Sequence, residues 1–432
     1  MSTTSISPVA VDAEDTRPFA WLRALGPRGR RAFGGAFGGF ALDAYDFQVL
    51  PLGLVAIASY FHLSSGRAGL LNTVTLLVSA AGGILAGVLI DRIGRTRTLV
   101  VTITTYAIFT VLCGLAPNFT MLLVFRGLQG LGFGGEWAAG AILVAEYAAT
   151  RYRGRTLAFV QSSWAVGWAF AVVVYTVVFK LVGDDLAWRV LLWTGALPAL
   201  LVWYVRRTVT DAPETTVRRA TRLAARRRHP ARSFAAIWRG RLAWTTLLAA
   251  LLATGAQGGY YTLATWLPTY LKTARHLSVV GTGGYLTFLI SGAFIGYVTA
   301  GYLADLLGRK RTFALFAALS AVLILAYTHI PDGANTALLI LGFPLGFTSS
   351  AIFSGFGSFL AELYPASIRG TGQGFTYNVG RAVGAFFPTM VGFLADSWGI
   401  GAAMAFGAVG YGLALVALLG LPETRGRELL DT

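Results

Sequence analysis

The chain has 432 residues, of which 55% are hydrophobic and only 12% are charged, with a mean hydropathy of +0.64. This composition excludes a soluble protein of this length and is typical of a polytopic membrane protein. The formal net charge of +16 could indicate nucleic-acid binding, but the arginines lie in short clusters between apolar runs, at alternate loops. That distribution follows the positive-inside rule, so we expect a lipid bilayer and no nucleic acid among the partners.

Apolar runs of about 18 to 27 residues, each long enough to cross about 30 Å of hydrocarbon, predict twelve transmembrane helices. Residues 1–31 are polar and contain no signal-peptide core, so they predict a cytoplasmic amino-terminal tail. The first six helices, within an amino-terminal bundle of residues 32–205, are expected near 34–60, 68–90, 98–117, 120–148, 156–182 and 188–205. After a basic cytoplasmic linker at 206–242, six more are expected within a carboxyl-terminal bundle of residues 243–421, near 243–271, 279–303, 312–330, 336–362, 371–396 and 401–420. Residues 422–432 then form a cytoplasmic tail.

The two halves carry the same charged loops at nearly constant spacing. Asp305 follows Asp91 by 305 − 91 = 214 residues, and Glu362 follows Glu146 by 362 − 146 = 216 residues. This register indicates an internal duplication. Because the repeated sites lie at the predicted cytoplasmic helix ends, we expect them to form a gate at the inner mouth, besides setting the topology. The expected gate residues are Gly87, Asp91, Arg92, Gly94, Arg95, Glu146, Arg153, Asp305, Gly308, Arg309, Glu362 and Arg369.

The loop after the second helix of each half has the pattern Gly-x-x-x-Asp-(Arg)-x-Gly-Arg-(Arg/Lys), beginning at Gly87 and at Gly301. This pattern resembles the signature of the major facilitator superfamily, and the resemblance extends over the chain beyond the amino-terminal tail. It implies an all-α integral membrane protein with twelve transmembrane helices in two pseudo-symmetric six-helix bundles.

The first predicted helix contains two acids in its interior, Asp43 and Asp46. Their i, i+3 spacing places both carboxyl groups on one helix face, where they titrate as a coupled pair. Burial disfavours the ionised forms, so at least one of them is a candidate proton carrier. The alternative is that one acid pairs with an arginine and holds the bundles together.

The fourth predicted helix contains Arg126, Gln129, Phe133 and Glu136, which fall along one helical stripe and can face a common cavity. Arg126 keeps its charge and can hold a carboxylate through two hydrogen bonds, so it is the first candidate for substrate binding. Glu136 joins the two acids of the first helix as a proton-coupling candidate. The alternative for Arg126 is a place at the outer surface, paired with a carboxylate or a lipid headgroup.

The eleventh predicted helix contains Arg381, which has no counterpart in the first half, since 381 − 216 = 165 and that residue is Ala165. Such asymmetry in a duplicated scaffold indicates a specialised use, either contact with substrate or proton site, or pairing with Asp43 or Asp46 across the bundles. The further candidate polar contacts with substrate are Gln129, Gln161, Gln257, Tyr260, Tyr261 and Asn378.

Four segments narrow the resemblance within the superfamily: residues 43–47, 126–137, 265–271 and 378–381. Together they are similar to the sialate/lactate-type proton symporters for organic acids, with the aromatic-acid proton symporters next nearest. Aromatic-acid symporters usually carry glycine between the two helix-1 acids, where this chain has Ala44.

No nucleotide-binding loop, nucleophile–base pair or metal cluster is evident in the sequence, so we expect neither an enzyme nor a cofactor or metal. The glycine-rich run 127–135 lies within a predicted membrane helix and predicts close helix packing. We therefore expect a monomeric secondary transporter of the bacterial inner membrane, with both termini cytoplasmic, that couples protons to the symport of a small organic anion, a monocarboxylate. The alternatives are a proton-driven exporter of drugs or metabolites and a membrane nutrient sensor.

Overall fold

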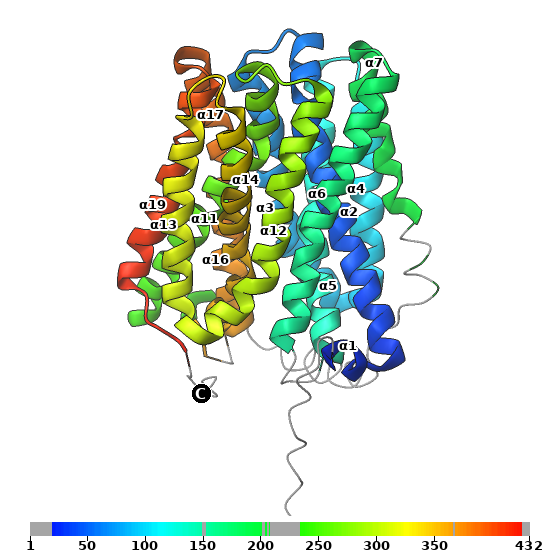
Figure 1. Cartoon of the computed structure of the whole chain (residues 1–432). Helices are drawn as coiled ribbons and strands as arrows, with labels where there is room; N and C mark the ends of the chain where they lie inside the picture. The colour runs from blue at the N-terminus through cyan, green and yellow to red at the C-terminus, as the bar shows by residue number, and fades with distance from the viewer. Residues whose placement is uncertain are drawn as a thin grey trace, which may run out of the picture.

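The computed structural model describes residues 20–148, 153–200, 204, 207, 234–365 and 368–425; the side chains at 87–88, 90–91, 95, 135–142, 145–146, 153–154, 184 and 305 are not part of this description. The described chain is nearly all helical, and its long helices run side by side (Figure 1). We call the end that carries α1 and the turn between α12 and α13 the basal end, and the opposite end the apical end.

The amino-terminal half is built from six long elements preceded by one short helix. Asn118 caps α5 by accepting a hydrogen bond from the backbone N–H of Met121, which satisfies a donor at the helix start. The elements are α1 (Ala20–Ala24), α2 (Gly26–Tyr60), α3 (Ser65–Ile93), α4 (Arg95–Gly114), α5 (Phe119–Tyr147), α6 (Arg153–Leu181), α7 (Asp184–Trp193) and the 3₁₀ turn η2 (Thr194–Ala196).

The carboxyl-terminal half repeats this arrangement with more interrupted helices. Ser278 caps α12 as Asn118 caps α5. The elements are α11 (Arg241–Thr273), α12 (Val279–Leu307), α13 (Arg309–Thr328), α14 (Asn335–Ala351), η3 (Ile352–Gly355), α15 (Phe356–Leu363), α16 (Arg369–Gly384), α17 (Phe386–Trp398), α18 (Ile400–Met404) and α19 (Gly407–Gly420).

Each predicted span coincides with helical structure in the described residues. The last three spans differ from the prediction because each is divided: η3 follows α14, and single breaks separate α16 from α17 and α18 from α19. The break after α16 precedes Pro388, which has no N–H to donate to the preceding turn. The predicted tail is also shorter, because Trp21 packs on Phe33 and Phe159, so residues 20–24 and 26–31 are helical.

Glycines let α5 approach its neighbours closely, as the sequence predicts for the run 127–135. A Cβ on Gly132 would lie 2.6 Å from the carbonyl oxygen of Thr102 on α4, and one on Gly134 would lie 2.7 Å from the backbone nitrogen of Gly83 on α3. Any larger side chain would force these helices apart, so the packing prediction is confirmed at these positions.

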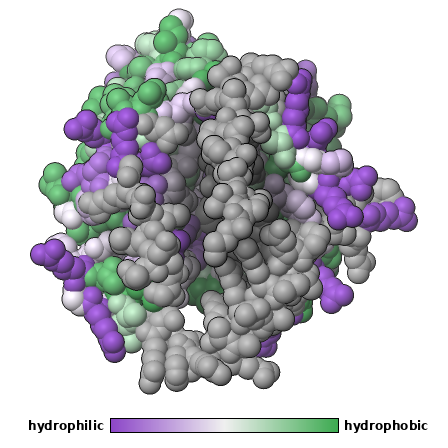
Figure 2. All heavy atoms as spheres, turned by 90° about the horizontal axis from the view of Figure 1, so that it is seen from below, coloured by the Kyte–Doolittle hydropathy of each residue, from purple (hydrophilic) through white to green (hydrophobic). Residues whose placement is uncertain are grey.

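Among the described residues, eight helices are long and apolar enough to cross a membrane by length and composition. Many large apolar side chains on their outer faces are exposed, as expected for contact with lipid. Seen from the basal end, hydrophilic side chains gather around the rim of the molecule (Figure 2). The chain is therefore an integral membrane protein whose basal rim lies in the polar region.

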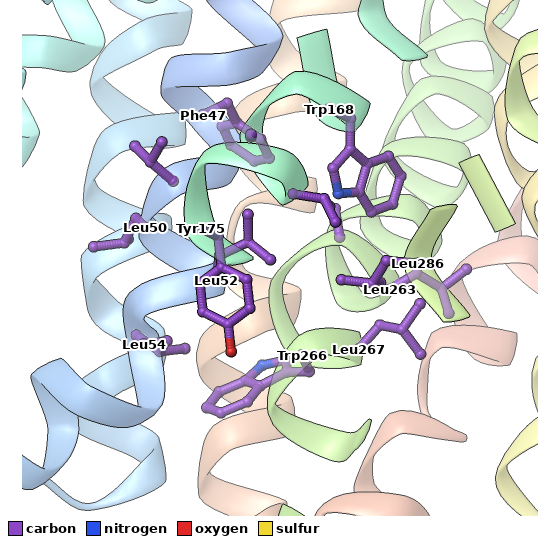
Figure 3. Close-up of a cluster of buried hydrophobic side chains, with 14 of the residues drawn as sticks. Phe47, Leu50, Leu52, Leu54, Trp168, Tyr175, Leu263, Trp266, Leu267 and Leu286 are labelled. Atoms are coloured by element: carbon purple, nitrogen blue, oxygen red, sulfur yellow. The ribbon is translucent and has the colours of Figure 1, made fainter. Parts of the chain in front are cut away.

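The two halves meet through α2 against α11, α3 against α16 and α17, and α6 against α12. Apolar side chains from these helices converge between the halves, including Phe47 of α2, Trp168 of α6, Trp266 of α11 and Leu286 of α12 (Figure 3). The same interface holds the buried charged residues.

Candidate functional site

Asp46, in the middle of α2, is fully buried and is paired with a buried arginine through an amide. Its Oδ2 accepts a hydrogen bond from Nε2 of Gln129, whose Oε1 accepts one from Nη1 of Arg126. Arg126 and Gln129 lie one turn apart on α5, and Arg126 is also fully buried. An isolated buried charge is costly, so this proximity of opposite charges compensates both residues.

The network continues across the interface between the bundles. Nη2 of Arg126 donates to Oδ1 of Asn72 on α3 at 3.2 Å, and Nδ2 of Asn72 donates to Oγ1 of Thr265 on α11 at 2.7 Å. Asn72 was not a predicted site residue. The signal was present, since a buried amide inside an apolar run also needs a hydrogen-bond partner.

Beside Asp46, Gln129 has a second hydrogen-bond acceptor, and one carboxylate oxygen of Asp46 has no hydrogen-bond partner. Nε2 of Gln129 also donates to Oγ1 of Thr110 on α4 at 2.8 Å. Cys113, one turn further along α4, is fully buried and close enough to Arg126 to interact with it electrostatically. Oδ1 of Asp46 has no hydrogen-bond partner. A proton could therefore bind at Oδ1 without breaking the contact that Oδ2 makes with Gln129.

Arg381 of α16 lies on the other side of the same interface, with 7% of its surface exposed. Its charge interacts with that of Asp43 on α2, and it hydrogen-bonds Tyr261 of α11. The guanidinium also lies over the ring of Phe133 at 5.7 Å and over that of Tyr377 at 5.4 Å. The structure thus brings Arg381 beside Asp43, which is the pairing that the sequence analysis gives as one alternative.

An aromatic layer lies at the same interface, against Arg381 and next to Asp46 in the sequence. Phe47 stacks on Phe133 with ring centroids 5.4 Å apart and contacts Tyr261 at 6.1 Å. Nε1 of Trp164 on α6 donates to the hydroxyl of Tyr260 on α11 at 2.6 Å, which joins the bundles on a second side. The rings therefore form apolar walls around a few fixed polar groups, as in many sites for small molecules.

Among the remaining predicted substrate contacts, Tyr261, Gln257 and Asn378 have hydrogen-bond partners inside their own bundle. The hydroxyl of Tyr261 donates to Oε1 of Gln257 at 2.9 Å, and Nε2 of Gln257 donates to the backbone carbonyl of Tyr377 at 3.1 Å. Nδ2 of Asn378 donates to its own helix, at the carbonyl of Gly374. Gln161 is half-buried on α6. Of this group, Tyr260 and Tyr261 lie in the aromatic layer, beside Trp164 and Arg381 respectively.

At the basal end, predicted gate residues of the second half contact one another. Nε of Arg309 lies 3.4 Å from Oε1 of Glu362, and Nε of Arg369 donates to the carbonyl of Ala361 at 2.9 Å. These contacts lie within one bundle. Gly94 and Gly308 occupy the same left-handed conformation, with φ of 95° and 97°, which explains the glycine in each repeated loop.

Glu423 completes this basal cluster and was not a predicted site residue. Its carboxylate accepts hydrogen bonds from the backbone N–H groups of Arg309 at 2.9 Å and Lys310 at 3.2 Å, at the start of α13. Oγ1 of Thr424 donates to Glu362. Residues 422–432 were predicted only as a cytoplasmic tail, and the structure shows that Glu423 within them caps α13.

Several predictions fall on side chains outside the described part of the chain, and they stay predictions. Arg92 is exposed at the basal end of α3. The predicted residues outside the description are Gly87, Asp91, Arg95, Glu136, Glu146, Arg153 and Asp305.

Comparisons with known proteins agree with this arrangement. A family model described as Major Facilitator Superfamily matches residues 36–299 and 285–431. The D-xylose-proton symporter has a similar structure, with a TM-score of 0.73 at 19% sequence identity, over 95% of this chain and 100% of that chain.

Two curated relatives are similar over most of their length. The chain is 39% identical to the probable 4-methylmuconolactone transporter of Cupriavidus pinatubonensis, over 94% of each chain. It is 32% identical to the cis,cis-muconate transport protein of Acinetobacter baylyi, over 86% of this chain and 88% of the relative.

Proposed function

Because this chain belongs to the major facilitator superfamily, a family of membrane transporters, we propose that it imports a small organic anion together with protons by alternating access. The named substrates of the two relatives, 4-methylmuconolactone and cis,cis-muconate, support an organic-acid substrate. We further propose that the substrate is a monocarboxylate, and that a single chain carries out the transport.

The observation that carries this proposal is the balance of buried charge between the bundles. Asp43 and Asp46 supply two negative charges and Arg126 and Arg381 two positive charges, so −2 + 2 = 0 when all four are ionised. A monoanion entering this layer would leave one uncompensated negative charge, and burying such a charge is costly. One proton restores neutrality, which gives one proton for each monocarboxylate.

The geometry favours different tasks for the two pairs. Asp46 is the proposed proton carrier, because its Oδ1 is free while Oδ2 is held by Gln129. Arg381 is the proposed partner of the substrate carboxylate, because the aromatic rings beside it can hold an apolar body. Arg126 then compensates Asp46, since both of its terminal nitrogens already donate to amides.

The proposed orientation places the basal end in the bacterial cytoplasm, as the charge distribution predicts. Protons and substrate would enter from the apical side while Asp46 is accessible there. With the layer neutral, the aromatic walls close around the substrate and the bundles rock toward a basal opening. Release of the proton and the anion into the cytoplasm restores the two ion pairs.

The test is uptake by purified protein in liposomes, with an inward pH gradient and a panel of labelled acids that includes muconolactone-like, aromatic and short aliphatic monocarboxylates, with a dicarboxylate for comparison. Each coupled proton contributes about 1.4 kcal/mol per pH unit, so a gradient of two units can concentrate a monocarboxylate about 100-fold. Because one proton with one monoanion is electroneutral, a membrane potential set by potassium and valinomycin should leave this accumulation unchanged. Accumulation of cationic dyes in place of any acid would contradict import and favour the exporter alternative.

A further inference from the structure

The hydrogen bonds that link Asp46 to Thr265 have a fixed direction, which Arg126 in the middle of the network determines. Arginine can only donate, so the atoms of Asn72 and Gln129 that face Arg126 must be the amide oxygens. The amide nitrogens then point outward, that of Gln129 to Asp46 and that of Asn72 to Thr265. A change in the position of Arg126 would therefore free the Asn72 amide to turn and would weaken its bond to Thr265.

The Asn72–Thr265 bond lies beside the contacts that close the interface between the bundles at the apical side. The next residue of α3, Thr73, donates to the carbonyl of Ala385 at 2.6 Å and shares a hydrogen bond of 2.7 Å with Thr389 of α17. Nearer the apical end, the backbone N–H of Ser65 donates to the carboxylate of Asp396 at 2.9 Å. These bonds, all between α3 and the opposite bundle, form an apical seal of which Asn72–Thr265 is the member connected to Arg126.

We propose that Asn72 and Thr265 are positioning residues that couple the charge of Asp46 to the closure of the apical seal. The inference rests on the proposed proton-carrying role of Asp46. When Asp46 is ionised, Arg126 is held between Gln129 and Asn72, and the Asn72 amide is oriented toward Thr265. When Asp46 is neutral, Arg126 loses its compensating charge and is no longer held in this position, so the bond that Asn72 makes across the bundles loses its orientation.

Few other ionisable groups face Asp46 in the described structure. Arg126 of α5 and Cys113 of α4 lie close to it, and Tyr45 precedes it on α2. Asp43 is on the same helix face but is engaged with Arg381. A pH response that Asn72 transmits would therefore be lost in Asp46→Asn, which identifies the group that titrates.

The experiment measures opening of the apical seal directly, without substrate or transport. Leu54 lies two turns from Phe47 on the same face of α2, toward the apical end, and is 2% exposed. In a Cys113→Ala background, Leu54→Cys is labelled with a maleimide from pH 5 to pH 8. Each rate is divided by the rate of the SDS-unfolded protein at the same pH, which removes the titration of the thiol itself.

We expect the normalised rate to change about fivefold with pH, the factor expected from one net hydrogen bond. Asn72→Ala and Thr265→Val should each abolish this change, and the double variant should behave as either single variant does. Thr265→Val keeps the shape of the side chain, so it tests the bond even if Asn72→Ala folds poorly. Thr73→Val is the matched control, because it removes a neighbouring bond of the seal that is not connected to Arg126 and should alter the rate equally at every pH.

The inference is overturned if Asn72→Ala and Thr265→Val retain the pH response, or if the background protein shows none. Neither result decides the proposed function, because proton-driven uptake in liposomes is measured separately. Conversely, a pH-dependent seal in a protein that accumulates no acid would support the coupling and contradict the substrate assignment.

Discussion

The two buried arginines, one in each bundle, have different surroundings. Arg126 is fully buried and donates to the amides of Gln129 and Asn72, both on helices of its own bundle. Arg381 contacts Asp43 of the opposite bundle and lies over two aromatic rings. Amide oxygens fix a guanidinium in place, whereas ring faces leave its in-plane donors available.

This difference shows how two bundles related by duplication can hold different functional sites. The position equivalent to Arg381 in the first half is Ala165, so the second arginine is not a product of the repeat. The amino-terminal bundle then holds the proposed proton site with its own fixed counter-charge. The carboxyl-terminal bundle supplies Arg381, whose charge interacts with that of Asp43 and which lies over two aromatic rings.

The largest effect is expected from Asp46→Asn, which removes the proposed proton site and keeps the shape of the side chain. Gradient-driven accumulation should fall from about 100-fold to none, since each coupled proton contributes about 1.4 kcal/mol per pH unit. Exchange of internal for external substrate should persist, because it needs no net proton movement. The measurement is uptake with and without a pH gradient, beside counterflow.

Asp43→Asn is the matched control for that variant, one turn away on α2. It should impair substrate binding through Arg381 and retain the stimulation by a pH gradient. If Asp43→Asn alone lost the stimulation, the roles of the two acids would be reversed; if both variants kept it, neither acid would be the proton carrier.

The next effect separates the two arginines. Removing one partner of a buried charge pair costs about 2–5 kcal/mol. In Arg381→Gln this loss should fall on the affinity for substrate, with KM raised at least about 30-fold. In Arg126→Gln the loss of the charge partner should instead affect the protonation of Asp46. The pH profile of uptake should therefore shift, while KM at the optimal pH changes less. Equal effects of the two variants on KM would show that both arginines bind the substrate, as the sequence analysis expects for Arg126.

A smaller effect is expected at the hydroxyl that holds Arg381. Tyr261→Phe keeps the ring beside Phe47 but removes the oxygen that accepts from Arg381 and donates to Gln257. One net hydrogen bond contributes about 1 kcal/mol, so KM should rise about fivefold. Tyr377→Phe is the comparison, because its hydroxyl also contacts Arg381. An unchanged KM in both variants would mean that Arg381 does not need these hydroxyls to meet the substrate.

The helices and the main charged residues could be predicted from the sequence, because both follow from the free-energy cost of placing polar groups in lipid. A long apolar run has to form a helix in lipid, and an ionisable group inside it has to be paired or functional. That reasoning selected Asp43, Asp46, Arg126 and Arg381, which the structure brings to one layer.

Which acid faces which arginine could not be predicted, because it depends on the packing of α2 against α5 and α16. The same limit applies to Asn72 and Thr265. Asn72 lies 54 residues from its partner Arg126 and 193 residues from its partner Thr265 in the sequence. Glu423 was missed for a related reason: a tail carboxylate acquires a role only when the tail returns to the start of α13.

The smallest effect is expected at Glu423, because its carboxylate lies at the basal surface rather than in the buried layer. Burial by itself raises the pKa of Glu423, but hydrogen bonds from backbone N–H groups, among them those of Arg425 and Arg309, outweigh it and lower the pKa from its ordinary 4.5. A group whose pKa is lower in the folded state stabilises the fold above its unfolded pKa, and that contribution disappears as the pH falls through the folded value.

We therefore expect Glu423→Gln to lower the melting temperature of the purified protein by about 1–2 °C at neutral pH, the shift that corresponds to a surface contact of 1 kcal/mol or less. The difference from the unmodified protein should stay constant down to about pH 5 and shrink as the pH falls further, because protonation then removes the same charge from Glu423. Asp332→Asn, which removes a carboxylate that is 96% exposed, is the control and should change the melting temperature less. A difference that grew as the pH fell would contradict the capping of α13 by Glu423. A difference that disappears at low pH would separate the basal cluster, which acts through stability, from the central pairs, which act through coupling.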